Sequence, residues 1–286
     1  MEWNSLHLFI HDLTYHNNFL ITKLKPLIEI LKQKDLLEKY FFIIYWQGGN
    51  HIRFRFKSKN PEIVEEKLKE CFNQYLMTYE PKHVMSEKVY LDTYKKNKEN
   101  VIDLEMIKDG NIKKFKYEPE YDRYGGKEAI EYSENIFECS SEYALKIREI
   151  TAGNFNQRII IALDLFAVAI SNLSNKGKFL TYYKKYWEDF SENVKYNIIS
   201  EDKLFDFYFN RYQKIISNTP EFYNDWKESI NINLSKAISV NNVFENKELA
   251  NIMLLASHIH MNNNRLSIMP QLESILANVL LRCERM

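Results

Sequence analysis

Near the start of the chain, apolar and polar residues alternate in the way that is typical of β-strands. Residues 4–10 alternate, residues 41–46 form a short run of aromatic and β-branched residues, and residues 51–57 alternate strictly. A Gly-Gly segment at 47–50 joins the last two runs, so we expect a β-hairpin there. Two further strands are predicted at residues 89–94 and 112–117.

Elsewhere the apolar residues recur at helical spacing. This spacing is present between residues 20 and 37, and again after Asn60 and Pro61, which together are typical of a helix start. Beyond Gly126 the helical pattern dominates, and we expect helices at 129–150, 155–173, 179–194, 204–216, 249–260 and 272–283. The Asn-rich stretch 217–242 is expected to be looped in part.

These patterns predict an α+β fold, with an antiparallel sheet in the N-terminal part packed with a mainly helical C-terminal part. The change near Gly126 is one of secondary structure and not of polarity, and no linker-like stretch divides the chain. We therefore expect a single domain over residues 1–286, made of a β-containing lobe, 1–126, and a mainly helical lobe, 127–286.

Composition narrows the possible functions. The 39 basic and 39 acidic side chains cancel, which removes any overall electrostatic case for nucleic acid or a membrane surface as a direct partner. Cys71, Cys139 and Cys283 lie far apart with no CxxC pair, which argues against a zinc knuckle or a disulfide framework. No signal peptide and no run of about 18 apolar residues is present. We expect a cytoplasmic protein.

The strand at 51–57 carries an unusual basic side. Alternation places Ile52, Phe54 and Phe56 on one face and His51, Arg53, Arg55 and Lys57 on the other. A solvated basic face is the ordinary explanation. Two arginines spaced two residues apart also form a fork for a carboxylate or phosphate, because each guanidinium can bind an oxyanion through two hydrogen bonds.

The segment 117–126, YEPEYDRYGG, is a second candidate site. Gly125 and Gly126, placed before a predicted helix, would let the backbone approach a ligand and turn its N–H groups toward an anion. The ordinary alternative is a surface turn in which Glu120 pairs with Arg123. Both explanations remain open from the residues alone.

A third candidate lies at 257–266, SHIHMNNNRL. His258 and His260 are two residues apart and would lie on different faces of a helix, so they are poor joint metal ligands and no metal site is expected. One histidine could carry a proton, although most single histidines are structural. Arg265, beside three asparagines, is typical of a helix end.

Together and in this order, the three segments resemble one family, the small C-terminal domain of lantibiotic dehydratases, which also occurs as a free-standing thiopeptide-type bacteriocin biosynthesis protein. The matching elements are Trp3, the strand pair FFIIYWQGGNHIRFR, the turn YEPEYDRYGG and the late segment HMNNNRL. The resemblance extends from Trp3 to Cys283 and is weakest between about 175 and 245.

The resemblance implies a lyase of RiPP biosynthesis, the making of ribosomally synthesised and modified peptides. Such a module eliminates glutamate from glutamylated Ser or Thr in the core of a precursor peptide with a leader, leaving dehydroalanine or dehydrobutyrine. The chain begins where the module would begin, so the resemblance also implies a separate subunit that glutamylates the peptide from glutamyl-tRNA. It implies no metal or organic cofactor.

The resemblance further implies roles for individual residues. Arg53 and Arg55 would bind the glutamyl group and stabilise developing charge, and Arg123, oriented by Glu120 or the glycine turn, would add a third cation. His260, in preference to His258, would transfer a proton as acid or base. The remaining substrate-binding candidates are His51, Tyr124, Gly125, Gly126 and Arg265.

Two other functions are compatible with the same resemblance. Free-standing relatives act as pyridine synthases, which join two dehydroalanines in a formal [4+2] cycloaddition. A non-catalytic partner that holds the leader peptide is the other alternative. The presence of Arg53, Arg55, Glu120, Arg123 and His260 favours elimination, and we expect the three polar clusters to converge on one pocket.

Overall fold

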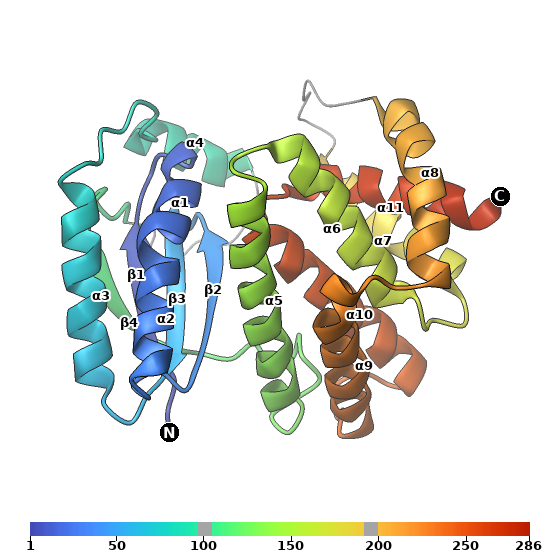
Figure 1. Ribbon diagram of the computed structural model, residues 1–286, viewed down its shortest axis with the longest axis horizontal. Coiled ribbons are helices and arrows are strands. Elements are labelled where there is room, and N and C mark those ends of the chain that lie inside the picture. Colours follow the sequence, from blue (N-terminus) through green and yellow to red (C-terminus); the bar gives the residue numbers. More distant parts are fainter. Residues whose placement is uncertain (97–104, 192–199) are drawn as a thin grey trace. The chain divides into compact units, whose positions relative to one another are not determined.

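A computed structural model describes residues 1–96, 105–191 and 200–286. The chain divides into two compact units, Met1–Glu118 and Pro119–Met286 (Figure 1). The first unit holds a four-stranded antiparallel sheet and the second is helical, which confirms the α+β class. The division falls before Gly126, so the turn at 119–126 belongs to the helical unit. The single domain expected over 1–286 stays a prediction.

The sheet has the strand order β2-β3-β1-β4. Its strands are β1 (Asn4–Phe9), β2 (Lys39–Tyr45), β3 (His51–Lys57) and β4 (Ile112–Lys116). The predicted hairpin of β2 and β3 is confirmed, and β3 lies inside the sheet between β2 and β1. All neighbours are antiparallel.

The strand predicted at 89–94 is wrong, because these residues belong to helix α4 (Glu87–Lys96). The Ser86 hydroxyl accepts from the Val89 backbone N–H, so Ser86 acts as an N-cap that the apolar pattern did not reveal. Tyr90 of this helix is buried, and its hydroxyl accepts from the N–H of Gly48 in the hairpin turn at 2.6 Å.

One face of the sheet is the core of the first unit. Leu6 and Leu8 of β1 pair with Phe54 and Ile52 of β3, and all four side chains are buried. Each such side chain contributes roughly 1.5–3 kcal/mol through burial. Figure 1 shows this face covered by α1 (Thr14–Phe19), which continues through a π-helical turn (Leu20–Leu24) into α2 (Lys25–Gln33), and by α3 (Pro61–Leu76).

The other face of the sheet carries the basic residues of β3, as the alternation predicts. We call it the cationic face and define it by His7 of β1, Phe41 and Tyr45 of β2, and His51, Arg53, Arg55 and Lys57 of β3. The register places His7 opposite Arg53 and Phe41 opposite Arg55. The strict alternation of β3 therefore separates a hydrocarbon core from a charged surface.

The second unit contains each helix that the sequence predicts, together with one further helix at 224–239 that it does not predict. They are α5 (Ile130–Ile150), α6 (Phe155–Ile170), α7 (Lys176–Ser191), α8 (Glu201–Ser217), the 3-10 turn η2 (Glu221–Tyr223), α9 (Asn224–Ser239), α10 (Lys247–Arg265) and α11 (Pro270–Arg285). Helix α7 packs along α11, and α5 packs against α9 and α10. The Asn-rich stretch is looped only at 218–220 and 240–242, because α9 fills its middle.

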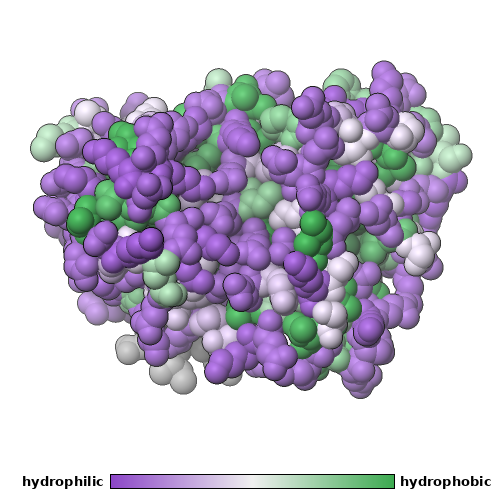
Figure 2. Space-filling model, turned by 60° about the horizontal axis from the view of Figure 1, so that its bottom comes forward, coloured by the Kyte–Doolittle hydropathy of each residue, from purple (hydrophilic) through white to green (hydrophobic). Residues whose placement is uncertain are grey.

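Two observations concern where the apolar residues lie. Among the described residues, none of the helices combines the length and the apolar character needed to cross a bilayer. Hydrophilic residues cover most of the face shown in Figure 2, and apolar residues occur there in small groups.

Candidate functional site

On the cationic face, His51 holds Arg53 in place. Its Nδ1 lies 2.7 Å from the Gly49 carbonyl oxygen, and a carbonyl can only accept, so Nδ1 carries the proton. Nε2 is then the acceptor for the Arg53 Nε–H at 3.1 Å. Burial lowers the pKa of His51 to about 3. A neutral imidazole of fixed tautomer therefore positions the guanidinium.

Aromatic rings support both arginines. The Arg53 guanidinium carbon lies 3.6 Å from the centre of the Tyr45 ring. That of Arg55 lies 4.7 Å from Tyr117 and 5.3 Å from Phe41. Cation–π contacts of this kind fix the plane of a guanidinium without using its N–H groups. The aromatic residues of the first unit thus preorganise two cations on one face.

His7 completes this face as a second neutral histidine. Its ring stacks on His51 at 4.9 Å and 21°, and it contacts Phe115 at 4.3 Å. Burial, reinforced by the neighbouring His51 ring and by the charges of Arg53 and Arg55, lowers the pKa of His7 to about 2. At neutral pH the positive charge of the histidine–arginine cluster therefore resides on its arginines.

In the second unit, His260 of α10 is paired with a buried carboxylate. Its Nδ1 lies 2.7 Å from Oε1 of Glu273 on α11, and Glu273 is fully buried. The other oxygen of Glu273 accepts from Asn263 Nδ2 at 3.1 Å and from the Tyr183 hydroxyl. The His260 ring also stacks on Trp187 at 4.3 Å. Nδ1–H thus points at a carboxylate, which leaves Nε2 as the unprotonated nitrogen of the neutral ring.

Sequence reasoning missed Glu273, Tyr183 and Trp187. The pair His260–Glu273 joins two different helices, so no helical spacing relates the two residues. The one local signal was Pro270, which predicts a helix start and places Glu273 in the first turn.

Arg123 lies along the same face of α10 as His260. Its Nε donates to Ser257 Oγ at 3.3 Å, and Ser257 precedes His260 by three residues on the helix. Arg123 Nη1 donates to Glu120 Oε2 at 3.2 Å, which is the pairing expected from sequence. Arg123 therefore contacts α10 about one helical turn before His260, and Glu120 contacts Arg123.

His258 points the other way, as its spacing from His260 predicts. It is buried against α5, where Nε2 lies 3.3 Å from Ser133 Oγ and Phe137 packs beside the ring. Burial, followed by the charges of Arg265 and Arg123, lowers the pKa of His258 to about 3. Tyr124 is also buried, with its ring 5.4 Å from that of His258.

The two glycines of the turn at 119–126 make room for a loop. Gly125 and Gly126 have φ values of +81° and +106°. Asn242 donates its N–H to the Gly125 carbonyl at 3.1 Å, and a Cβ on Gly126 would lie 1.9 Å from Asn242 Oδ1. The expectation that Gly126 turns its N–H toward an anion is wrong, because this N–H donates to the Tyr121 carbonyl at 2.8 Å.

Arg265 ends α10, as its position among the asparagines predicts. It is 1% exposed, and it donates to Ser141 Oγ of α5 at 3.0 Å and to the Met261 carbonyl at 2.8 Å. These contacts anchor α10 on α5. The substrate-binding roles of Arg265, Gly125 and Gly126 stay predictions.

The cationic face belongs to the first unit and the His260 cluster to the second, so the convergence of the polar clusters on one pocket stays a prediction. Among the described residues, no three His, Cys, Asp or Glu side chains are grouped closely enough to hold a metal ion.

The chain matches the family model described as lantibiotic biosynthesis dehydratase C-term over residues 3–283, and it belongs to this family. Among curated proteins, none matches the chain.

Three solved structures share the fold. The pyridine synthase TbtD from thiomuracin biosynthesis has a TM-score of 0.77 at 11% identity, covering 99% of this chain and 97% of that one. The tRNA-dependent lantibiotic dehydratase MibB from Microbispora sp. 107891 has a TM-score of 0.64 at 14% identity, and this chain spans 28% of its length while being covered completely. TsrL has a TM-score of 0.63 at 15% identity, covering 100% of this chain and 96% of that one.

The contact between Gly126 and Asn242 makes a testable prediction about stability. Gly126→Ala should cost at least about 1 kcal/mol more than Gly153→Ala in the free energy of unfolding, measured with urea. Both positions have positive φ, which costs roughly 1–2 kcal/mol for alanine, but no atom lies within 4 Å of a Cβ at Gly153. Equal losses for the two variants would contradict the close approach.

The buried histidines make a prediction about pH. Since their pKa values are lowered in the folded protein, the unfolded chain binds protons that the folded chain does not, and stability falls as pH drops below about 6.5. Each of these histidines should lower the free energy of unfolding by about 2 kcal/mol between pH 7 and pH 5. His7→Phe keeps the ring stack. In urea unfolding, this variant should lack the part of the pH-dependent loss of stability that His7 causes. An unchanged pH dependence in that variant would show that His7 titrates normally.

Proposed function

We propose that the protein is a lyase that eliminates glutamate from glutamylated Ser or Thr of a ribosomally made precursor peptide, leaving dehydroalanine or dehydrobutyrine. The observation that carries this proposal is the His260–Glu273 pair, which lies on the same face of α10 as Arg123. Membership of the lantibiotic dehydratase C-terminal family supports it.

The reaction breaks the Cα–H and Cβ–O bonds of the esterified residue and forms a Cα–Cβ double bond. The α-proton goes to a base, and the electron pair of the Cβ–O bond leaves with the glutamate carboxylate. We assign the base to Nε2 of His260. Glu273 holds the ring through Nδ1 and stabilises the imidazolium that forms, as a buried carboxylate does for a catalytic histidine.

Arg123 supplies positive charge on the same helix face. Glu120 and Ser257 orient its guanidinium, so that it can stabilise the enolate that develops when the α-proton leaves. Neither Tyr124 nor Arg265 is exposed enough to touch a substrate, and we assign both to positioning. Gly125 and Gly126 act indirectly, because they leave room for the loop that contains Asn242 to pack against the turn.

Arg53 and Arg55 suit the glutamyl group, which carries a free carboxylate. Their planes are fixed by Tyr45 and Tyr117, so little conformational entropy is lost when they bind. His51 positions Arg53 as a neutral acceptor and adds no charge of its own. We propose that these arginines grip the carboxylate of the glutamyl ester.

The proposal requires partners. A separate subunit would glutamylate the precursor peptide from glutamyl-tRNA, and both proteins would work in the cytoplasm. The elimination balances without a redox or metal cofactor. The shared fold with MibB, described as a tRNA-dependent dehydratase, agrees with a place in such a pathway.

Pyridine synthesis is the second candidate. TbtD matches nearly the whole of this chain and is itself nearly wholly matched, at a TM-score of 0.77. In that case the protein would join two dehydroalanines in a formal [4+2] cycloaddition. The arginine pair, which suits a carboxylate that this reaction lacks, favours elimination. A scaffold that only binds the leader would need no oriented His260.

Elimination can be tested directly. The protein, incubated with glutamylated precursor peptide, should release glutamate and produce dehydrated peptide, both visible by mass spectrometry. Arg53→Lys keeps the charge but loses the planar fork, and should lower kcat/KM by roughly 10–100-fold. Closure of an already dehydrated peptide, with no glutamate released from the glutamylated one, would establish the pyridine synthase instead.

The role of Glu273 has its own test. Glu273→Gln keeps the shape of the side chain but loses the charge that stabilises the imidazolium, so kcat should fall by about 100-fold or more with little change in KM. Glu284→Gln is the matched control, since Glu284 also lies on α11 and accepts from a tyrosine hydroxyl, that of Tyr212. Equal activity of the two folded variants would remove Glu273 from the mechanism.

A further inference from the structure

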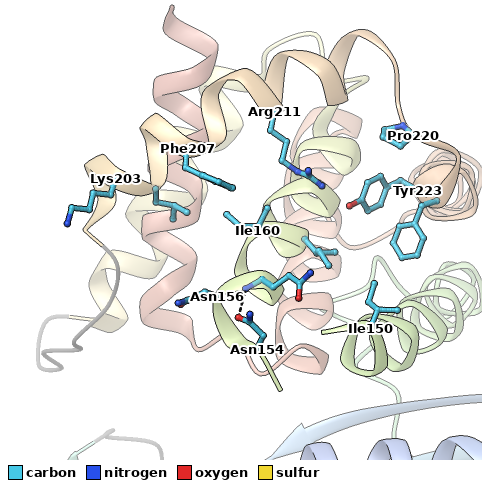
Figure 3. A pocket seen from close by; sticks show the side chains of 13 residues that line it. Ile150, Asn154, Asn156, Ile160, Lys203, Phe207, Arg211, Pro220 and Tyr223 are labelled. Atoms are coloured by element: carbon cyan, nitrogen blue, oxygen red, sulfur yellow. Dashed lines mark hydrogen bonds between the residues drawn. The ribbon is translucent and has the colours of Figure 1, made fainter. Parts of the chain in front are cut away.

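A pocket of about 940 Å³ lies in the second unit, between α6, α8 and the 3-10 turn η2 (Figure 3). Its lining comes from the end of α5, the start of α6, helix α8 and the segment 220–223. These residues include none of the candidate site residues predicted from the sequence. Its volume is that of an ordinary ligand site.

Large apolar side chains stand exposed around this pocket. Phe207 is 66% exposed, Ile150 is 55% exposed and Phe222 is 41% exposed. They come from α8, α5 and η2, so three separate elements contribute apolar side chains to the opening of the pocket. Exposed apolar groups gathered in this way, and rimmed by polar residues, mark a surface that binds another molecule.

Among the described residues, the charged side chains that line the pocket are Lys203 and Arg211, and both are basic. Glu201 and Asp202 precede Lys203, but both are paired with Arg282 of α11, at 3.5 and 2.8 Å. The first turn of α6 also borders the pocket and contains no acidic residue. Its helix dipole adds partial positive charge on the side of the pocket that Asn154 and Asn156 line. The pocket therefore favours an anionic group.

Arg211 is held rigidly on this wall. Its Nε and Nη2 donate to Asp164 at 2.8 and 2.5 Å, and Asp164 is fully buried in the middle of α6. The hydroxyls of Tyr208 and Tyr223 donate to the same carboxylate at 3.0 and 2.6 Å. The hydrogen bonds from Arg211 to Asp164 raise the pKa of Arg211. Asp164 balances the charge of Arg211, so Lys203 and the helix end supply the net positive field.

Amide side chains provide the remaining polar groups. Asn154 caps α6 by accepting from the Gln157 N–H at 3.1 Å, and Asn156 and Gln157 line the pocket beside it. Amide groups can both donate to and accept from a peptide backbone. Figure 3 shows Asn154 and Asn156 on the side of the pocket away from Arg211 and Tyr223.

We propose that this pocket binds a peptide segment in which a large apolar side chain stands next to a carboxylate. The apolar side chain would pack against Phe207 and Ile160, the carboxylate would face Lys203, and the amides would bind the backbone. We assign the segment to the substrate peptide, away from the residue that reacts. That assignment of the source rests on the proposed function.

The test uses the full chain and fluorescein-labelled peptides that contain Phe-Ile-Asp, Leu-Phe-Asp or Phe-Leu-Glu between glycines. Fluorescence anisotropy should show saturable binding of at least one peptide. Replacing its acid by the amide, or its Phe by Ala, should weaken binding at least fivefold. Absence of binding by all three peptides would overturn the proposal.

Substitutions at the pocket test whether the peptides bind there. Phe207→Ala and Lys203→Glu should each weaken it at least fivefold, because both side chains are exposed at the pocket and changing them leaves the core intact. Ile232→Ala on α9 and Lys214→Glu on α8 are the matched controls, exposed residues outside the pocket lining, and should bind as the wild type does. Equal weakening in the controls would show that the binding is nonspecific.

Other occupants have distinct outcomes. Equally tight binding of 3-phenylpropionate and the best peptide would identify a site for small acids and reject the peptide. A dimer that Phe207→Ala converts to a monomer in sedimentation would make this surface a self-interface. These binding measurements need no turnover, so they hold even where glutamate elimination fails. If elimination is confirmed, Lys203→Glu should raise KM for the precursor at least fivefold with kcat unchanged.

Discussion

The buried carboxylate of Glu273 is the constraint on which the helical unit's chemistry depends. A charge with no exposure to water is tolerated only when its oxygens are hydrogen-bonded. The donors come from His260 and Asn263 of α10 and Tyr183 of α7, so satisfying one carboxylate fixes three helices. The orientation of the His260 ring is a consequence of folding and does not wait for a substrate.

On the cationic face, the constraint is the repulsion between positive charges that lie close together. Arg53 and Arg55 are separated by one residue, and two histidines lie beside them. The histidines remain neutral because they are buried, so they fill space without adding repulsion. The rings of Tyr45 and Tyr117 then supply the weak attraction that steadies the guanidiniums.

Sequence predicted what depends on local pattern. The alternation at 51–57 located a strand and its two faces correctly, and the separation of His258 from His260 on α10 followed from helix geometry alone. Helix α4 was mistaken for a strand because a short apolar run fits both periods, and only the cap at Ser86 distinguishes them. Glu273 and Asp164 could not be found, since their partners lie on other helices and no spacing connects them.

The close approach of Asn242 to Gly126 constrains the loop before α10. Surface loops ordinarily accept insertions and deletions. Here the loop before α10 is seated against the turn that carries Arg123, while α10 carries His260. A change in the length of that loop would shift Arg123 and His260 relative to each other. Under the proposed function, the segment at 240–246 would therefore influence catalysis without touching the substrate.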